Sequence, residues 1–368
     1  MALTDIEAGR LADNVFNVVG ANKNLIINGA MQVAQRATQV TGITSAGYNT
    51  VDRFKVELNG IGTYTFDQAA DAPDDFTSSY KATCTTANAS PAAGAYGYFA
   101  YKVEAQDLQQ LNYGSSAAKA MTLSFWVKSN KTGNSTVTIL QRDNSLQLLS
   151  PQYSISAADT WEYKTISIPG DTGGLFNNDN GSGLEFEFYW NAGSTYTSGS
   201  HQTTWSTYNN ANRCPSALGV GGATSDYFAI TGVQLEVGSV ATPFEHRSYG
   251  QELALCQRYY VMLAKGNNRM MPGTYFYYAS TEIDIPMCFP VPLRASPSLE
   301  QQTGTNFFRS FPTGDEFDGW TAIQYASPPS APTAINIYRG TDISGTTGDA
   351  GYVLLRDSTA YVALSAEL

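Results

Sequence analysis

The chain has 368 residues, which is long enough for two or three domains with sizeable cores. Its formal net charge is −11 with only 21 Lys and Arg residues, and no basic stripe is visible, so we expect no nucleic-acid partner. The same charge disfavours anionic polysaccharides and phospholipid head-groups as ligands. Charged residues make up 14% of the chain, against about 25% in a typical globular protein. A surface of Ser, Thr, Asn, Gln and Gly is therefore expected, which suits many short strands with polar outer faces.

Residues 1–23 carry a weakly amphipathic pattern of Ile6, Leu11, Val15 and Val18. The segment is too short to be stable as an isolated helix, so we expect it to pack against other chains, with docking on its own domain as the alternative. It contains acidic residues and no apolar run, and no later segment approaches the roughly 18 apolar residues of a membrane span. We therefore expect no signal peptide, no membrane insertion and synthesis in the cytoplasm.

Short strand-like runs separated by Gly, Ser and Asn fill the chain from Asn24 to Val240. This pattern predicts an all-β fold, an antiparallel β-sandwich built from two sheets. In Leu184–Phe188 the alternation predicts that Glu185 and Glu187 face away from the buried side. The predicted strands are Val51–Leu58, Thr63–Asp67, Tyr80–Thr85, Tyr96–Val103, Met121–Lys128, Ser135–Gln141, Trp161–Ile168, Leu184–Trp190 and Tyr227–Val237.

A helix is predicted to join this sandwich to a second β-domain. Ser248 followed by Gln251 is a capping-box signature, and Tyr249, Leu253, Cys256 and Tyr260 recur at the spacing of one helical face. We expect the sandwich to span residues 24–247, the linker helix 248–263 and a smaller C-terminal β-domain 264–368. The strands predicted in the latter are Thr281–Phe289, Trp320–Tyr325, Thr333–Tyr338, Tyr352–Leu355 and Tyr361–Leu364.

Three motifs resemble those of a known family. VQLEVGSVATPFEHRSYGQELALCQRYY (233–260), NLIINGAMQVAQRAT (24–38) followed by YNTVDRF (48–54), and the final SAEL (365–368) are similar to segments of tail-fibre and related receptor-binding proteins of tailed bacteriophages, especially phages of marine bacteria. The resemblance implies a jelly roll like that of carbohydrate-binding modules, a smaller C-terminal β-domain and a homotrimer in the phage tail. The implied partners are other tail proteins, through residues 1–23, and a polysaccharide of the host cell surface.

Catalytic residues are not expected. Only His201 and His246 are available, and a structural hydrogen bond is the favoured role of His246 at the predicted domain joint. Glycosidic hydrolysis needs two carboxylates about 5 to 9.5 Å apart. The loop acids Asp74 with Asp75, and Asp315 with Glu316 and Asp318, are the candidates for such a pair, with solvated surface as the favoured interpretation.

No cofactor is expected, and a zinc site is disfavoured because Cys84, Cys214, Cys256 and Cys288 form no C-x-x-C pair. Four reduced, mostly buried thiols are the favoured interpretation. The loop 176–181 is rich in oxygen ligands, but Phe176 stands where an EF-hand loop needs its first ligand. A structural calcium ion held in another way remains an alternative without assigned ligands.

Sugar binding calls for an aromatic face beside amide and carboxylate groups that hydrogen-bond the hydroxyls. Residues 201–210 supply both, and Trp205, Tyr208 and Asn209 are the predicted carbohydrate-binding residues. The alternative for Trp205 is that it covers a sheet edge. A second candidate surface, of which some members must be core, consists of Tyr275, Tyr277, Tyr278, Phe307, Phe308 and Trp320.

The leading hypothesis is a non-enzymatic phage tail-fibre or receptor-binding protein that recognises host surface glycans during adsorption. The first alternative is a structural virion component, such as a head fibre, decoration or tail-nozzle protein, without a receptor role. The second alternative is a polysaccharide depolymerase.

Overall fold

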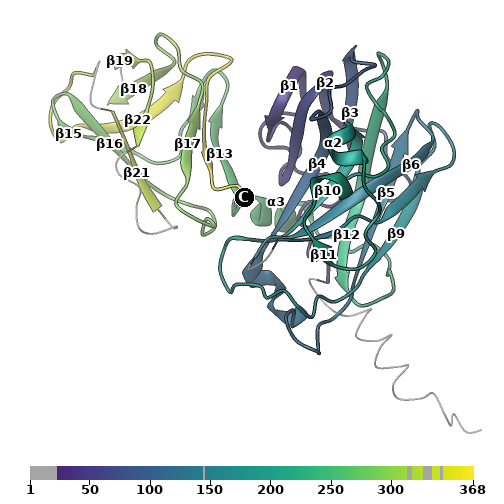
Figure 1. Ribbon diagram of the computed structural model, residues 1–368. Coiled ribbons are helices and arrows are strands. Elements are labelled where there is room, and N and C mark those ends of the chain that lie inside the picture. The colour runs from purple at the N-terminus through teal and green to yellow at the C-terminus, as the bar shows by residue number, and fades with distance from the viewer. Residues whose placement is uncertain (1–22, 144–145, 313–316, 326–333, 340–342) are drawn as a thin grey trace, which may run out of the picture. The chain divides into compact units, whose positions relative to one another are not determined.

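The computed structural model describes residues 23–143, 146–312, 317–325, 334–339 and 343–368 (Figure 1). The chain divides after Glu252 into two compact units, Met1–Glu252 and Leu253–Leu368. The predicted segment 1–23 lies outside the described residues except for Lys23. None of the helices among the described residues is long and apolar enough to cross a membrane.

The first unit is an antiparallel β-sandwich of jelly-roll type, and the predicted all-β fold class is confirmed. Its strands pair in the order β11-β7-β6-β10-β4-β2-β3-β12-β5-β9, with β1 added to β2 and β8 to β6. The strands are β1 Gln39–Gly47, β2 Phe54–Ala69, β3 Ser79–Ala87, β4 Tyr96–Glu104, β5 Met121–Ser129, β6 Gly133–Gln141, β7 Gln147–Leu149, β8 Gln152–Ile155, β9 Glu162–Ile168, β10 Ser182–Ala192, β11 Ser206–Thr207 and β12 Tyr227–Val237. The short helices are η1 Ala105–Leu111, α2 Ser194–Thr197 and η2 Asn210–Asn212.

Inward-facing residues of distant strands share one hydrophobic core. Phe125 of β5 and Phe188 of β10 are not on neighbouring strands, yet their ring centroids lie 5.2 Å apart. Phe99 of β4 and Phe228 of β12 likewise lie 6.2 Å apart. The two halves of the strand order therefore face each other across the core, which makes the unit a sandwich.

Strand β2 is longer than predicted, because it joins the two runs that we expected to be separate strands. Its first part, Phe54–Asn59, pairs with β4, and its second part, from Gly62 onward, pairs with β3. Gly60 and Gly62 have φ values of +66° and +113°, which side chains disfavour, and they allow the strand to change partners. Strand β1 was not predicted, because its mostly exposed QVTGITSAG sequence has no apolar alternation.

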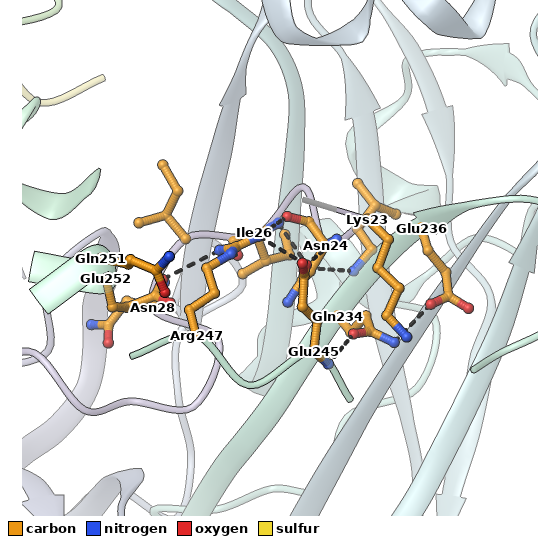
Figure 2. Close-up of polar contacts among 12 residues, drawn as sticks. Lys23, Asn24, Ile26, Asn28, Gln234, Glu236, Glu245, Arg247, Gln251 and Glu252 are labelled. Atoms are coloured by element: carbon orange, nitrogen blue, oxygen red, sulfur yellow. Dashed lines mark hydrogen bonds and ion pairs between the residues drawn. The ribbon is translucent and has the colours of Figure 1, made fainter. Parts of the chain in front are cut away.

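The two longest family-like motifs meet in the first unit. The side chain of Asn24 donates from Nδ2 to the carbonyl of Val233 at 3.2 Å, and its Oδ1 accepts from the backbone N–H of Leu235 at 3.0 Å. Its backbone N–H donates to Glu245 Oε2 at 2.8 Å (Figure 2). Asn24 is 4% exposed, so these hydrogen bonds satisfy buried polar groups.

Arg247 extends the same network toward the end of the unit (Figure 2). It donates to the carbonyls of Asn24 and Ile26 and pairs with Glu252, at 3.4 Å from the carboxylate. Glu252 in turn accepts from the backbone N–H of Asn28. We call residues 23–29 and 233–252 the N-terminal clasp, and its contacts assign these motifs a structural role within the unit.

Helix α3, Tyr249–Gln257, spans the division between the two units and is shorter than the predicted 248–263. The predicted capping box is confirmed, since Ser248 Oγ accepts from Gln251 N at 3.3 Å and Gln251 Oε1 accepts from Ser248 N at 3.0 Å. The predicted helical face is wrong at its two ends: Tyr249 is 57% exposed, and Tyr260 begins strand β13.

The second unit is also built from antiparallel strands. One sheet has the order β13-β23-β17, and the other has the order β19-β18-β22-β15-β16-β21-β20 with β14 added to β22. A separate core includes Tyr275, Tyr277, Phe308 and Trp320. The strands are β13 Tyr260–Lys265, β14 Arg269–Met270, β15 Tyr275–Ala279, β16 Glu282–Cys288, β17 Ser298–Gln301, β18 Phe308–Pro312, β19 Phe317–Trp320, β20 Gln324–Tyr325, β21 Ala334–Arg339, β22 Ala350–Leu355 and β23 Tyr361–Ser365.

Candidate functional site

A hollow of about 830 Å³ lies in the first unit, on the outward face of β12, β5 and β9. It is lined mainly by aromatic, small and acidic residues, and we call it the aromatic groove. The lining residues are Asp74, Asp75, Phe76, Ser124, Trp126, Tyr163, Gly232, Ala241, Thr242, Pro243, Phe244 and His246.

The two-residue period of strand β5 determines which of its side chains form the floor of the groove. Phe125 of β5 is buried in the core, so its neighbours Ser124 and Trp126 face outward. Trp126 lies directly opposite Tyr163 of β9, and the two ring centroids are 5.3 Å apart. Tyr163 is 44% exposed. The pair therefore presents aromatic surface on the outer face of an edge strand and its neighbour.

Gly232 connects this floor to the opposite wall. It lies in an irregularity of β12 and has φ +59°. A Cβ atom at this position would lie 2.7 Å from the ring of Phe76 and 2.9 Å from the ring of Trp126. Both rings therefore rest against the same glycine, and the aromatic surface continues from one wall to the other.

Phe76, Phe244 and His246 form the opposite wall. The centroid of Phe76 lies 5.0 Å from that of Phe244 and 5.4 Å from that of His246. Phe244 and His246 lie 4.9 Å apart. Within the described residues His246 makes these ring contacts in place of the structural hydrogen bond that we expected.

The wall is held in place by the N-terminal clasp. Glu236 on β12 accepts from Thr242, and Gln234 Oε1 accepts from the backbone N–H of Glu245 at 2.8 Å. The ammonium of Lys23 donates to Thr242 Oγ1 and to the carbonyl of Pro243, both at 2.6 Å. These contacts pre-organise the segment that carries Phe244 and His246, which lowers the entropic cost of binding.

The electrostatics of the groove are acidic. Asp74 and Asp75 are exposed carboxylates on its lining, and the lining includes no Lys or Arg. Two basic groups lie near it: Lys23 donates to the lining residues Thr242 and Pro243, and Lys128 of β5 is paired with Asp71 at 2.9 Å. Burial opposes ionisation of Asp71, but hydrogen bonds from Lys128 and Trp161 outweigh it and lower the pKa of this carboxyl.

The predicted binding residues Trp205, Tyr208 and Asn209 lie elsewhere in the first unit. The indole N–H of Trp205 donates to the carbonyl of Pro169 at 2.7 Å, and the ring packs against the main core. These are structural contacts, and the alternative that Trp205 covers a sheet edge stays a prediction beside sugar binding. Trp205 also lines a separate hollow of about 450 Å³.

Tyr208 and Asn209 are not among the residues that line the hollow of Trp205. Tyr208 donates to Asn210 Oδ1 at 2.6 Å, and Asn209 caps η2 by accepting from Ala211 N at 3.0 Å. Neither residue lines the aromatic groove. Sugar binding at Trp205, Tyr208 and Asn209 stays a prediction.

The predicted catalytic acids and the second predicted aromatic surface lie in different parts of the chain. Asp74 and Asp75 line the aromatic groove, whereas Asp315 and Glu316 lie outside the described residues and Asp318 falls in β19. In the second candidate surface, four rings are core, Phe307 is partly buried and only Tyr278, at 65%, is largely exposed. The four core rings are those of Tyr275, Tyr277, Phe308 and Trp320.

Glu185 and Glu187 point away from the main core, as the alternation predicted, but both are buried, at 3% and 0% exposure. Arg142 pairs with Glu185, and the segment that contains Arg213 covers Glu187. Arg213 pairs with Glu187 at 2.5 Å and donates to the hydroxyl of Tyr98 at 3.0 Å. Burial raises the pKa of Glu187, although Arg213 partly opposes this.

Among the described residues, no three or more His, Cys, Asp or Glu side chains gather in one place. Cys84, Cys214 and Cys256 are reduced and buried, and Cys288 is reduced and exposed. In the loop 176–181, Asp179 Oδ1 accepts from Gly181 N at 2.8 Å.

The aromatic groove was not found from the sequence, although one signal was present. Period-two alternation in 123–127 places Trp126 on the outward face with Ser124, where a large ring is unusual. Phe76 and Phe244 come from distant segments, and no local pattern brings them together.

No protein-family model and no curated protein sequence matches the chain. Solved structures with some similarity include the enzymatically active domain of tailspike protein 4 of bacteriophage CBA120, with 14% identity and a TM-score of 0.30 over 58% of this chain. That match covers 21% of the tailspike chain, so this chain spans about a fifth of it. A xylan-binding domain (CBM22-1) of Paenibacillus barcinonensis Xyn10C matches over 60% of this chain and 100% of its own, with 10% identity and a TM-score of 0.30. The C-terminal family 22 carbohydrate-binding module of Clostridium thermocellum Xyn10B matches over 61% and 99%, with 9% identity and a TM-score of 0.30.

Proposed function

We propose that this chain is a phage receptor-binding protein that recognises a host surface glycan in its aromatic groove. The observation that carries glycan recognition is the groove itself, in which Trp126 and Tyr163 are held beside Asp74, Asp75 and backbone-anchored loops. The phage role is supported by the three motifs that resemble tail-fibre proteins.

The groove has the chemistry that a pyranose requires. The apolar face of a sugar ring packs on aromatic faces, while carboxylate and hydroxyl groups accept and donate hydrogen bonds at its edge. Trp126 and Tyr163 supply the first requirement, and Asp74, Ser124 and Thr242 supply the second. A volume of about 830 Å³ accommodates a short oligosaccharide.

Binding of purified host surface polysaccharide to single variants tests this function. Tyr163→Ala removes an exposed ring from the groove, and we expect affinity to fall roughly five- to tenfold, the scale of about 1 kcal/mol for a lost aromatic contact. Tyr278→Ala, in the second unit, removes a ring with 65% exposure outside the groove and is the matched control. Equal affinity of Tyr163→Ala and wild type would contradict glycan binding in the groove, and Trp205→Ala then tests the other candidate.

We further propose that recognition occurs without cleavage. The depolymerase alternative has one observation in its favour, because Asp74 and Asp75 line the groove and are carboxylates. Incubation with host capsule or lipopolysaccharide should release no oligosaccharide. Release that stops in Asp74→Asn or Asp75→Asn would favour the enzyme instead.

In the virion, this proposal places the chain in the tail as a homotrimer, attached through residues 1–23. Three copies of a weak site bind a repetitive surface polysaccharide with high avidity, so each groove needs only modest affinity. Locating the chain in intact particles separates this role from that of a head fibre, decoration or tail-nozzle protein.

A further inference from the structure

We propose that the aromatic groove selects a glycan that carries a free ammonium group, that is, an amino sugar without its N-acetyl group. This inference rests on the proposed function and adds the chemical class of the ligand. It follows from the charges around the groove, from its aromatic walls and from a cation site that the same unit already contains.

The charges on the lining are negative. Asp74 and Asp75 are both exposed there, no Lys or Arg is among the lining residues, and the nearby ammonium of Lys23 is bound by Thr242 and the carbonyl of Pro243. The ammonium of Lys128 is held by both carboxylate oxygens of Asp71, at 2.9 and 3.1 Å. Because like charges repel, acidic sugars are disfavoured in the groove, whereas an ammonium group is attracted to it.

The aromatic walls favour a cation for a second reason. Ring faces carry negative electrostatic potential, and an ammonium group within about 6 Å of a ring centroid is attracted to it. Trp126, Tyr163, Phe76 and Phe244 enclose the groove from two sides. A neutral sugar gains stacking from these rings, whereas an amino sugar gains stacking and the cation–π contribution together.

The first unit binds one of its own cations with this combination of groups. The guanidinium carbon of Arg213 lies 5.6, 5.9, 5.2 and 6.0 Å from four tyrosine ring centroids, and Glu187 is its counter-ion. The four rings are those of Tyr98, Tyr189, Tyr196 and Tyr208. Lys81 likewise lies 4.2 Å from the ring centroid of Tyr227. The aromatic groove offers rings and carboxylates of the same kinds to an external ligand.

The test compares the full-length protein's affinity for two matched oligosaccharides, a glucosamine tetrasaccharide with free amines and its fully N-acetylated form. We expect the free-amine form to bind at least about tenfold more tightly at low salt, a difference of about 1.4 kcal/mol. Added salt should reduce this preference, because screening weakens the attraction between ammonium and carboxylate but leaves stacking unchanged.

Two variants assign the preference to the groove. The double variant Asp74→Asn with Asp75→Asn should lose most of the preference, because its affinity for the free-amine form should fall much further than its affinity for the N-acetylated form. Asp349→Asn changes an exposed carboxylate in the second unit and should leave both affinities unchanged.

Equal binding of the two oligosaccharides, tighter binding of the N-acetylated form, or binding of neither overturns the ammonium preference. So does a preference that survives in the double variant. A cationic peptide that competes as well as the free-amine sugar would also overturn it, because the groove would then be a protein-binding site. The proposed function fails separately, when Tyr163→Ala leaves host-polysaccharide binding unchanged.

Discussion

At the scale of single residues, Gly232 decides whether the groove can exist. Its φ of +59° is costly for any other residue, and its missing side chain is what lets the rings of Phe76 and Trp126 approach. Two physical effects, backbone strain and ring contact, therefore coincide at this position.

We expect Gly232→Ala to lower the free energy of unfolding by about 2 to 3 kcal/mol, combining strain at positive φ with overpacking of the two rings. Gly42→Ala is a matched control, because Gly42 has φ +74° but nothing within 4 Å of its added Cβ. Denaturant titration of both variants separates strain from contact. An equal loss of unfolding free energy in the two variants would show that contact with the rings of Phe76 and Trp126 does not matter at Gly232.

The buried carboxylate of Asp226 should make the stability of the folded chain depend on pH. This carboxylate is 4% exposed and accepts from the backbone N–H groups of Gly221 and Ala223 at 3.2 and 2.9 Å. Burial opposes its ionisation, but hydrogen bonds from Ala223, Lys131 and Gly221 outweigh it, and the pKa is lowered.

Because the folded-state pKa of Asp226 lies below the unfolded value of about 3.9, its stabilisation is complete above that pH and is lost as pH falls through the folded pKa. We expect Asp226→Asn to destabilise the protein at neutral pH by roughly 1 to 3 kcal/mol. The deficit should shrink below about pH 4. Chemical denaturation at several pH values measures this, and a deficit that is constant with pH would refute it.

At the scale of elements, the outward face of each strand acquires its role from what covers it. On β10 the outward acids Glu185 and Glu187 are buried and paired with Arg142 and Arg213. On β5 the outward Trp126 stays accessible, because the segment after β12 forms a wall beside it and not a lid over it. The same alternation thus yields a buried ion pair on one strand and a groove floor on another.

The N-terminal clasp connects the groove wall to the start of the sandwich. Replacing Asn24 tests how much the clasp contributes to stability. We expect Asn24→Ala to cost about 2 to 4 kcal/mol, because the backbone N–H groups of Ile26 and Leu235 lose their acceptor. Affinity for the glycan should fall as well, since the side chain of Asn24 also holds Val233, the neighbour of Gly232 in the groove.

The matched control for the clasp is Asn59→Ala. Asn59 is exposed, and its side chain donates to the carbonyl of Gly94 at 3.2 Å. Thermal melting and glycan titration of both variants distinguish a specific clasp from a general loss of amide groups. Similar melting temperatures for the two would rule out the clasp as a major source of stability.

At the scale of the whole molecule, we expect a homotrimer. The amphipathic pattern of apolar residues in the sequence of 1–23 and the low share of charged residues, 14%, favour association. Sedimentation should give about three times the 39.7 kDa chain mass, and removal of residues 1–22 should shift it toward the monomer. A stable full-length monomer would contradict this prediction.

Two kinds of information account for what could be predicted and what could not. Alternation and capping act between neighbours in the chain, so the sequence alone determined the all-β class, strand β12 at Tyr227–Val237 as observed, and the Ser248–Gln251 cap. Which outward faces are covered depends on segments far apart in the chain. Only the tertiary structure placed Phe76 and Phe244 beside Trp126, buried Glu187 under Arg213 and turned Trp205 toward Pro169. The physical reason is that a strand's period specifies two faces, whereas packing between distant segments decides which of them is open to a ligand.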